Sequence, residues 1–302
     1  MALKDIKAKI KSVQRTHKVT RAMEAVSAVK MRKTVSTALA GRAYARAALA
    51  ILARLSGSAG VSRHPLATVR EVKKVALVVI TSDKGLAGAL NSSVIKEAVK
   101  DVAAYPVEAV TVFAYGKTGV EYFARRNYKI AAAVENKGDT ISFEHMEEVA
   151  RTLAAGFTAG DFDQVLAVYS NFKSTFEQSP TLRTLLPLSL ASIERLVADI
   201  VPAKGKFSEV VNIVAPAAYE VEPSAEDVLD ILIQRLVATS LYHMLLEAKA
   251  SEHSARMVAM KNASDKSEEV AHDLTRLFNK IRQAAITREV SEIVSGREAL
   301  AA

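Results

Sequence analysis

The sequence contains neither cysteine nor tryptophan among its 302 residues, and aromatic residues make up only 6% of it. Without cysteine there is no disulfide framework, no thiolate metal site and no cysteine nucleophile, which excludes many classes of secreted and redox protein. Half of the residues are hydrophobic and a quarter are charged, as in an ordinary globular protein. We therefore expect a chain of this length to bury a substantial core without covalent crosslinks.

Long uncharged runs are also missing. The longest stretches without Asp, Glu, Lys or Arg, such as residues 85–95 and 236–246, are far shorter than the roughly 20 residues that cross a bilayer. The first residues alternate lysines with single apolar residues and so lack the apolar core of a secretory signal, and Asp5 interrupts the pattern of a mitochondrial transit peptide. We expect no segment to span a membrane.

Proline and glycine are almost absent from the two ends of the chain. All seven prolines lie between residues 65 and 223, and residues 1–56 and 224–302 hold only Gly41 and Gly296. Because proline breaks helices and glycine weakens them, this distribution predicts two long helices around a compact centre. We predict an N-terminal coiled-coil helix over residues 1–56, a central α/β domain over 57–223 and a C-terminal coiled-coil helix over 224–302.

Both end segments have the heptad spacing of a coiled coil. In the first segment the predicted seam begins with Leu3, Ile6, Ile10, Val13, His17, Thr20, Glu24 and Ser27 and continues to Leu55. In the last segment it comprises Leu241, Met244, Ala248, Ser251, Ala255, Val258 and Asn262 and then, after a phase shift, Val270, Leu274, Leu277, Ile281 and Ala284. We predict an antiparallel pair in which the small residues 38–48 face the small residues 248–255 and residues 287–302 project as a tip.

The central segment alternates apolar runs with helical patterns, which is typical of a mainly parallel sheet covered on both faces. We predict a Rossmann-like α/β domain with strands at residues 75–80, 107–114, 128–133 and 164–169. Helices are expected to end near residues 104 and 126, and a third helix, capped by Ser142, to end near 159. The segments TLRTLLPLSL and VVNIVAP, within residues 172–215, are predicted to be further strands.

The net charge of +8 is concentrated at the N-terminal end. Residues 1–56 contain thirteen Lys and Arg but only two acidic residues, Asp5 and Glu24. The last segment adds a local basic group of Arg276, Lys280, Arg282 and Arg288. A helix of this charge predicts an acidic partner, which could be a nucleic acid, an anionic membrane or an acidic protein surface.

Sequence motifs for catalysis or cofactor binding are missing. YGKTG follows a predicted strand as a phosphate loop would, but Thr111 occupies the position of its required first glycine. The turn SDKGLAGALN offers at most a weak anion site near Lys84, and the six histidines have no metal-binding spacing. We therefore predict no catalytic residue, no cofactor and no metal ion in this chain.

Three sequence strings point to a known family. KVTRAMEAVSAVKMRK (residues 18–33), SDKGLAGALN (82–91) and NKIRQAAITREVSEIVSG (279–296) closely resemble the signatures of the gamma subunit of F-type ATP synthases, in the same order along the chain. The chain departs from that family's common pattern at Lys84, where Arg is frequent, and at Ala87, where Cys is frequent. The cysteine-bearing regulatory insert of the chloroplast type is also missing, which argues against thiol regulation. We take the resemblance to be to the bacterial type, in preference to the mitochondrial and chloroplast types.

This resemblance implies the central rotor shaft of the proton-translocating synthase. Such a subunit threads its coiled coil through a ring of alternating alpha and beta subunits, while its globule sits on the epsilon subunit and the c-ring. Proton flow turns the shaft and drives the beta subunits through their catalytic states, so the shaft itself has no active site. The resemblance implies a peripheral protein at the cytoplasmic face of the bacterial plasma membrane, with no nucleic-acid partner.

The resemblance also implies which residues contact the beta subunits. Seven positions carry over, four from the first helix and three from the last: Lys18, Arg21, Met23, Lys30, Arg282, Gln283 and Thr287. Arg282 and Gln283 would hydrogen-bond beta-subunit loops at some rotary angles and release them at others.

Two other classes of function stay open on the residues alone. A basic coiled-coil arm also suits an RNA-binding protein, whose affinity would fall steeply with salt. An enzyme built on the α/β domain would instead need a nucleotide or other small molecule that stabilises this domain.

Overall fold

The structure is a computed structural model, which describes residues 3–40, 64–135, 142–188 and 224–301. The chain divides into two compact units. The smaller unit consists of Met1–Ala28 and Arg256–Ala302, and the larger one consists of Val29–Ala255. The predicted strand VVNIVAP and residues 41–56 of the predicted first helix lie outside the described residues.

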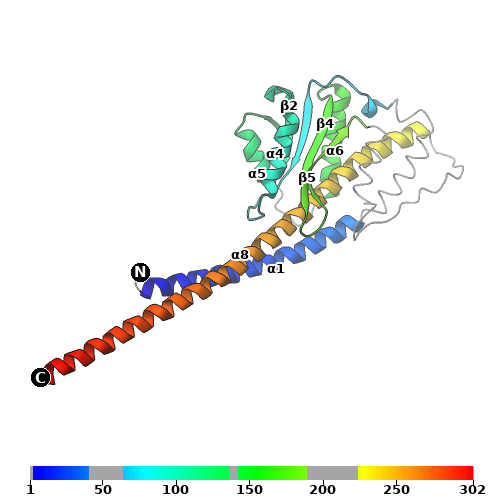
Figure 1. Ribbon diagram of the computed structural model, residues 1–302. Helices are drawn as coiled ribbons and strands as arrows, with labels where there is room; N and C mark the ends of the chain where they lie inside the picture. The colour runs from blue at the N-terminus through cyan, green and yellow to red at the C-terminus, as the bar shows by residue number, and fades with distance from the viewer. Residues whose placement is uncertain (1–2, 41–63, 136–141, 189–223, 302) are drawn as a thin grey trace. The chain divides into compact units, whose positions relative to one another are not determined.

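The larger unit is built on a five-stranded sheet with the order β3-β2-β1-β4-β5 (Figure 1). Neighbouring strands from β3 to β4 are parallel, and β5 is antiparallel to β4. The strands are β1 (Val75–Ile80), β2 (Val110–Tyr115), β3 (Lys129–Val134), β4 (Gln164–Phe172) and β5 (Gln178–Leu186). The predicted α/β class with a mainly parallel sheet is confirmed.

Three helices connect the parallel strands, and these are α4 (Leu90–Val102), α5 (Lys117–Ala124) and α6 (Phe143–Ala159). Two short 3-10 turns, Pro65–Ala67 and Val107–Ala109, precede β1 and β2. The second turn corrects the predicted start of the second strand, because Pro106 fixes the backbone ahead of a turn and the strand begins only at Val110. Ser142 stands at the N-cap of α6 as predicted, but its side chain makes no capping hydrogen bond.

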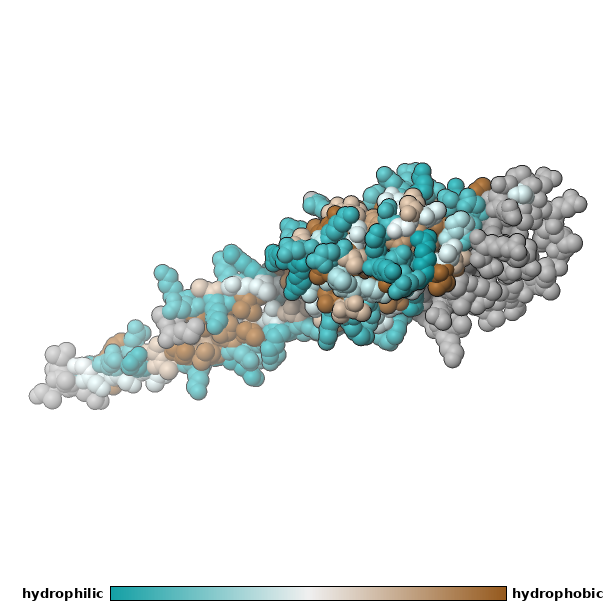
Figure 2. Space-filling view, turned by 90° about the horizontal axis from the view of Figure 1, so that it is seen from above, coloured by the Kyte–Doolittle hydropathy of each residue, from teal (hydrophilic) through white to brown (hydrophobic). Residues whose placement is uncertain are grey.

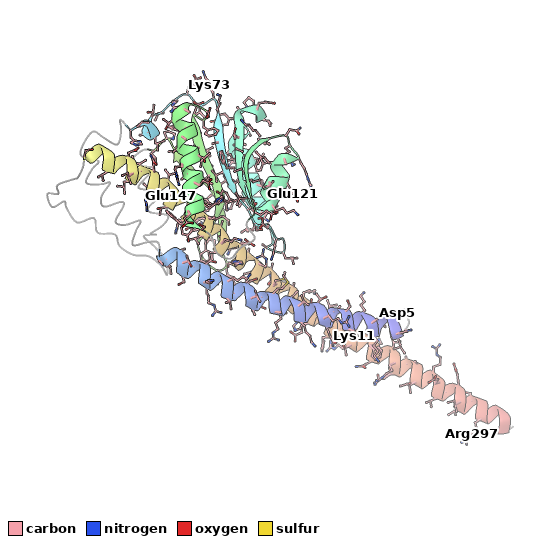
Figure 3. The ribbon with its side chains drawn as sticks, turned by 180° about the vertical axis from the view of Figure 1, so that it is seen from behind. Asp5, Lys11, Lys73, Glu121, Glu147 and Arg297 are labelled. Atoms are coloured by element: carbon pink, nitrogen blue, oxygen red, sulfur yellow. The ribbon has the colours of Figure 1, made fainter. Side chains whose placement is uncertain are left out.

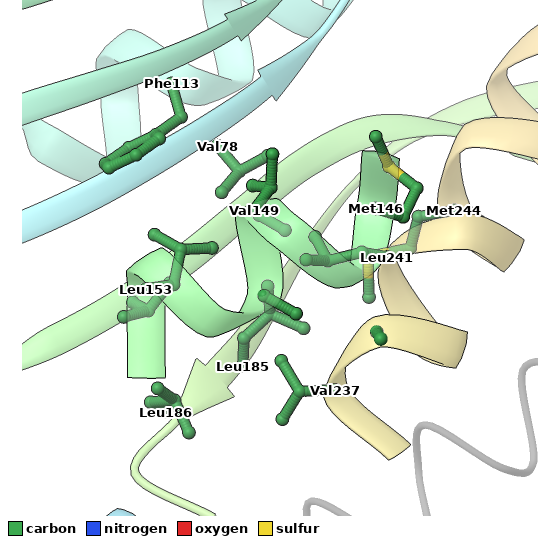
Figure 4. Packing of buried hydrophobic residues seen from close by; sticks show 14 of the residues in the cluster. Val78, Phe113, Met146, Val149, Leu153, Leu185, Leu186, Val237, Leu241 and Met244 are labelled. Atoms are coloured by element: carbon green, nitrogen blue, oxygen red, sulfur yellow. The ribbon is translucent and has the colours of Figure 1, made fainter. Parts of the chain in front are cut away.

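Both faces of the sheet are buried, as the continuous apolar strands predict. On one face Val94, Ala98 and Phe123 of α4 and α5 pack on the sheet. On the other face α6 packs beside the first part of α8 (Ala225–Ala301), and Figure 4 shows Met146 and Leu153 of α6 with Leu241 of α8 in this cluster. The segment predicted as the C-terminal coiled-coil helix thus also supplies core to the sheet.

The smaller unit is an antiparallel pair formed by α1 (Leu3–Ala40) up to Ala28 and by α8 from Arg256 onward (Figures 1 and 3). The predicted seam of α1 is confirmed here, because all of its members up to Ser27 are buried or half-buried while most positions between them are exposed. Ile6 is fully buried, and Thr20 and Ser27 are buried polar members of the seam.

The seam predicted for α8 is partly wrong in its phase. Asn262, Leu277 and Ala284 are exposed, and their places are taken by neighbouring residues. The buried or half-buried side is formed by Met260, Ser264, Ser267, Ala271, Leu274, Phe278, Ile281 and Ala285. Packing decides between the two phases, because Met260 and Phe278 offer more apolar surface to bury than Asn262 and Leu277.

Candidate functional site

The turn after β1, SDKGLAGALN, is closed by its own hydrogen bonds. Ser82 N–H donates to Asn91 Oδ1 at 3.0 Å, and Lys117 N–H, at the start of α5, donates to Asp83 Oδ1 at 2.7 Å. The Asp83 carboxylate therefore occupies the helix N-terminus at which a phosphate would bind. This turn acts as a rigid structural connection, and it holds Leu86 outward with 63% of its surface exposed.

Gly116 explains how the YGKTG turn packs against the end of β1. Its φ of +92° is in the left-handed region, and a Cβ placed there would lie 2.2 Å from the carbonyl oxygen of Thr81. The hydroxyl of Thr81 accepts a hydrogen bond from the backbone N–H of Gly119 at 2.9 Å. Glycine in this motif thus allows two turns to pack closely, a role that requires no ligand.

A groove of about 1270 Å³ runs between α6 and strands β2 and β3. Its apolar lining includes Phe113, Val134, Val149 and Phe162. Over the described ranges of the chain, no group of three or more His, Asp or Glu residues is placed to hold a metal ion. The groove offers apolar surface without a set of metal ligands.

The positions taken over from the resemblance lie in two groups. On α1, Lys18 and Arg21 are exposed, and Met23 is half-buried beside the seam. On α8, the side chains of Arg282, Gln283 and Thr287 are exposed. Lys30 is half-buried and belongs to the larger unit.

These two groups are not brought together. His17, next to Lys18, is hydrogen-bonded to Ser264 of α8. Arg282 follows Ser264 by 18 positions, which is roughly 27 Å along a helix at 1.5 Å per residue. The structure therefore provides two separate polar groups on the coiled coil, one beside its middle and one near the unpaired end of α8.

The end of α8 carries a feature that the sequence analysis missed. Every described side chain from Ile286 to Arg297 is exposed, and Arg297 lies on the part of α8 that continues past Asp5 of α1 (Figure 3). Four of these side chains are large and apolar, with exposed fractions of 51% to 70%: Ile286, Val290, Ile293 and Val294. We call these four residues the apolar stripe.

The spacing of the apolar stripe places it on one side of the helix. Arg282 and Gln283 lie one turn before Ile286 on that same side. Figure 2 shows apolar residues among polar ones on the thin left-hand end, which is the C-terminal end of α8. The signal was present in the sequence as the steps 286, 290, 293 and 294, but only the structure shows that no described part of the chain covers them.

A shorter apolar side exists on α1. Val19 and Val26 are 57% and 54% exposed, and Met23 lies between them at helical spacing. Exposed apolar residues arranged in this way on a charged helix are typical of a surface that another protein covers.

Comparison with known proteins assigns the family. The family described as ATP synthase matches residues 2–300 of the chain. The ATP synthase gamma chain of Roseiflexus castenholzii is 41% identical over 302 residues, covering 99% of this chain and 98% of that one. The gamma chain of Pelotomaculum thermopropionicum is 38% identical over 299 residues, covering 99% of both. The chain belongs to the ATP synthase gamma-chain family.

Solved structures agree with this assignment. The central stalk and c-ring structure of the Tetrahymena thermophila mitochondrial ATP synthase contains a chain that is 27% identical, with a TM-score of 0.60, covering 82% of this chain and 99% of that one. A chain of the Euglena gracilis mitochondrial ATP synthase, at 17% identity and a TM-score of 0.63 over 99% of this chain and 94% of its own, shares the fold.

The family membership confirms the function expected from the three signature strings. The chain is a gamma subunit, the central-stalk subunit of the ATP synthase rotor, and gamma is a non-catalytic subunit of the complex. Among the described helices none is both long and apolar enough to be a membrane span.

Proposed function

We propose that the coiled coil of this chain is threaded through a ring of alternating alpha and beta subunits and transmits the rotation of the c-ring to it. In this role the chain couples ion flow to ATP synthesis and regulates ATP hydrolysis. The epsilon subunit and the c-ring bind the chain at the foot of the stalk, at the cytoplasmic face of a bacterial plasma membrane. The bacterial relatives named above support this location.

The observation that carries the proposal is the apolar stripe on the unpaired end of α8. A helix with four large exposed apolar side chains is unfavourable in water, because more than half of the surface of each of these residues stays in contact with the solvent. A ring of subunits that surrounds the helix would cover these side chains. The stripe occupies one side of the helix, which suits a shaft that meets different partner faces in turn.

Beside the stripe, Arg282 and Gln283 are suited to transient polar contacts. Neither side chain has a hydrogen-bond or ion-pair partner in the part of the chain that the structure describes. Their donors are therefore available to beta-subunit loops, and Thr287, one turn further on, adds a hydroxyl group. Contacts of this kind can be made and released without disturbing the fold, because these two side chains are not tied to any other described residue.

The basic side of α1 supports contacts with acidic beta-subunit loops. The helix contains ten Lys and Arg but only two acidic residues, and every one of these cations except Lys30 is exposed. We infer that Lys18, Arg21 and Lys30 supply charge around an apolar contact made by Met23. An acidic protein surface would be attracted to this helix over a range of orientations.

Co-purification tests the proposed function. The chain would be tagged and expressed with its cognate alpha and beta subunits, and the purified complex assayed for ATP hydrolysis with and without the chain. A stoichiometric complex whose ATPase activity depends on the chain is expected. The proposal is wrong if no complex forms and the basic helix instead binds RNA with an affinity that falls steeply with salt.

A further inference from the structure

The groove beside α6 lies over the part of the sheet that is least covered on that face. Val78 of β1 and Ala167 of β4 are fully buried there, whereas Ala132 and Val134 of β3 are only half-buried. The opposite wall is formed by residues of α6 at helical spacing, which include His145, Val149, Thr152 and Gly156. With a volume of about 1270 Å³, the groove is large enough for a small-molecule ligand.

Two phenylalanine rings line this groove. Phe113 and Phe162 are packed edge to face, with ring centroids 6.0 Å apart and an angle of 82° between the ring planes. Gly156 allows this arrangement, because a Cβ at that position would lie 2.5 Å from the ring of Phe162. Figure 4 shows Phe113 together with Val149 of the α6 wall. Aromatic surface held in this way is suited to packing against a flat aromatic ligand.

Two polar atoms at one end of the groove have no hydrogen bond. Tyr115 follows Thr111 and Phe113 on the same face of β2 and is only 2% exposed. Its ring lies edge-on to the ring of His145, with the centroids 6.1 Å apart. Among the residues that the structure describes, neither the buried hydroxyl of Tyr115 nor the buried Nε2 of His145 has a hydrogen-bond partner. A ligand that reaches this end of the groove would therefore gain hydrogen bonds that the chain does not make.

The chemistry of this end favours an uncharged polar group. Burial, with a smaller contribution from the Glu148 carboxylate, raises the pKa of Tyr115 above its ordinary value of 10.0, so its hydroxyl is a neutral donor at pH 7. The side chain of Glu148 is 77% exposed, so a charged ligand group of either sign would lose its hydration here without a buried counter-ion. A hydroxyl group can accept from Tyr115 and also bond to either tautomer of His145.

We propose that this groove binds an uncharged aromatic alcohol. Its ring packs against Phe113 and Phe162, and its hydroxyl group bonds to Tyr115 and His145. The inference does not depend on the proposed rotor function, because no residue of the coiled coil takes part. A groove that binds no such ligand would leave the co-purification experiment unaffected.

A series of three probes tests the ligand class on the full-length chain. Naphthol carries the ring and the hydroxyl, naphthalene lacks the hydroxyl, and naphthoate replaces it with a charge. In fluorescence titrations we expect saturable binding of one naphthol per chain, and binding of the other two that is weaker by about tenfold, which is the effect of about one hydrogen bond. No saturable binding of naphthol, or equal affinities for naphthol and naphthalene, would overturn the proposal.

Three substitutions locate the site. Tyr115→Phe should weaken naphthol binding by about fivefold or more and leave naphthalene binding unchanged, and its melting temperature should not fall because the hydroxyl has no hydrogen bond to lose. Tyr122→Phe, on the other face of the sheet, is the matched control and should bind naphthol as the wild type does. Thr152→Trp places a large ring in the groove from an exposed position and should abolish binding of both probes. Undiminished naphthol binding by Tyr115→Phe or Thr152→Trp would overturn the assigned site.

Discussion

His17 Nδ1 lies 3.0 Å from the carbonyl oxygen of Ser264, a residue 247 positions later in the chain. Because a carbonyl can only accept, Nδ1 must carry a proton and donate it in this contact. The Ser264 hydroxyl lies 3.2 Å from the same nitrogen. This polar contact lies in the seam of the coiled coil and fixes the register of α1 against α8.

Replacing His17 should loosen this register. His17→Ala is expected to lower the free energy of unfolding of the smaller unit by about 1 kcal/mol, the usual net value of a hydrogen bond. Urea unfolding followed by circular dichroism would measure the change. The control is Lys18→Ala at the adjacent exposed position, and equal losses in the two variants would contradict the assigned contact.

The phase of the α8 seam can be tested at two neighbouring residues. Phe278 is half-buried in the seam, whereas Leu277 is 42% exposed. Phe278→Ala should therefore cost about 1–3 kcal/mol of stability, while Leu277→Ala should cost less than about 0.5 kcal/mol. Thermal unfolding of both variants decides the phase, and a larger loss in Leu277→Ala would restore the phase that the sequence suggested.

The apolar stripe should affect assembly and not folding. The double substitution Val290→Asp with Ile293→Asp leaves an exposed helix intact, so we expect an unchanged melting temperature for the free chain. Binding to the ring of alpha and beta subunits should weaken by about tenfold or more, because two charges would have to be buried. Ser295→Asp, at an exposed position on the opposite side of the helix, is the matched control for added charge and should assemble normally.

Arg282 should matter for coupling and not for stability. Arg282→Ala removes an exposed charge, which typically changes the free energy of unfolding by less than about 0.5 kcal/mol. In the assembled complex we expect ATP-driven rotation to slow by about fivefold, the effect of roughly 1 kcal/mol on a barrier. Arg276→Ala, on the part of α8 that pairs with α1, is the control. An unchanged rotation rate in Arg282→Ala would show that Arg282 makes no functional contact with the beta subunits.

Asp163 provides a pH-dependent contribution to the stability of the sheet. Burial raises the pKa of its carboxyl, but hydrogen bonds from the backbone N–H groups of Lys73 and Lys74, at 2.9 and 2.8 Å, outweigh this and lower the pKa below its ordinary value of 3.8. Asp163 therefore binds a proton more readily in the unfolded chain than in the folded chain. Its stabilisation of the fold is present above pH 3.8 and is lost as the pH falls through the folded-state pKa.

Substitution of Asp163 isolates this contribution. Asp163→Asn should be less stable than the wild type at pH 7, and the difference should shrink in acid below about pH 4, where the unfolded carboxyl begins to be protonated. Urea unfolding at a series of pH values would measure it. A difference that is constant from pH 7 to the acid limit would show that the charge of Asp163 does not contribute.

The order of helix, α/β centre and helix could be predicted because it rests on local properties. Proline and glycine restrict or weaken helices wherever they occur, so their confinement to the middle of the chain marks the centre. Continuous apolar runs predicted the parallel strands, and the heptad steps from Leu3 to Ser27 predicted the seam of α1. The sequence already argued against a phosphate-binding loop at YGKTG, because Thr111 stands where the first glycine of that motif is required. The structure adds a physical reason, since the Asp83 carboxylate lies at the start of α5, where a phosphate would bind.

What the sequence by itself determined is therefore which segments form helices and strands, and to which family the signature strings point. Only the tertiary structure decided which side of α8 faces α1, since Leu277 and Phe278 both satisfy the apolar pattern and the larger buried surface selects Phe278. It also showed that the early part of α8 completes the core of the sheet, and that Ile286 to Val294 stay uncovered. These outcomes depend on contacts between residues distant in sequence, whose free energies no local pattern contains.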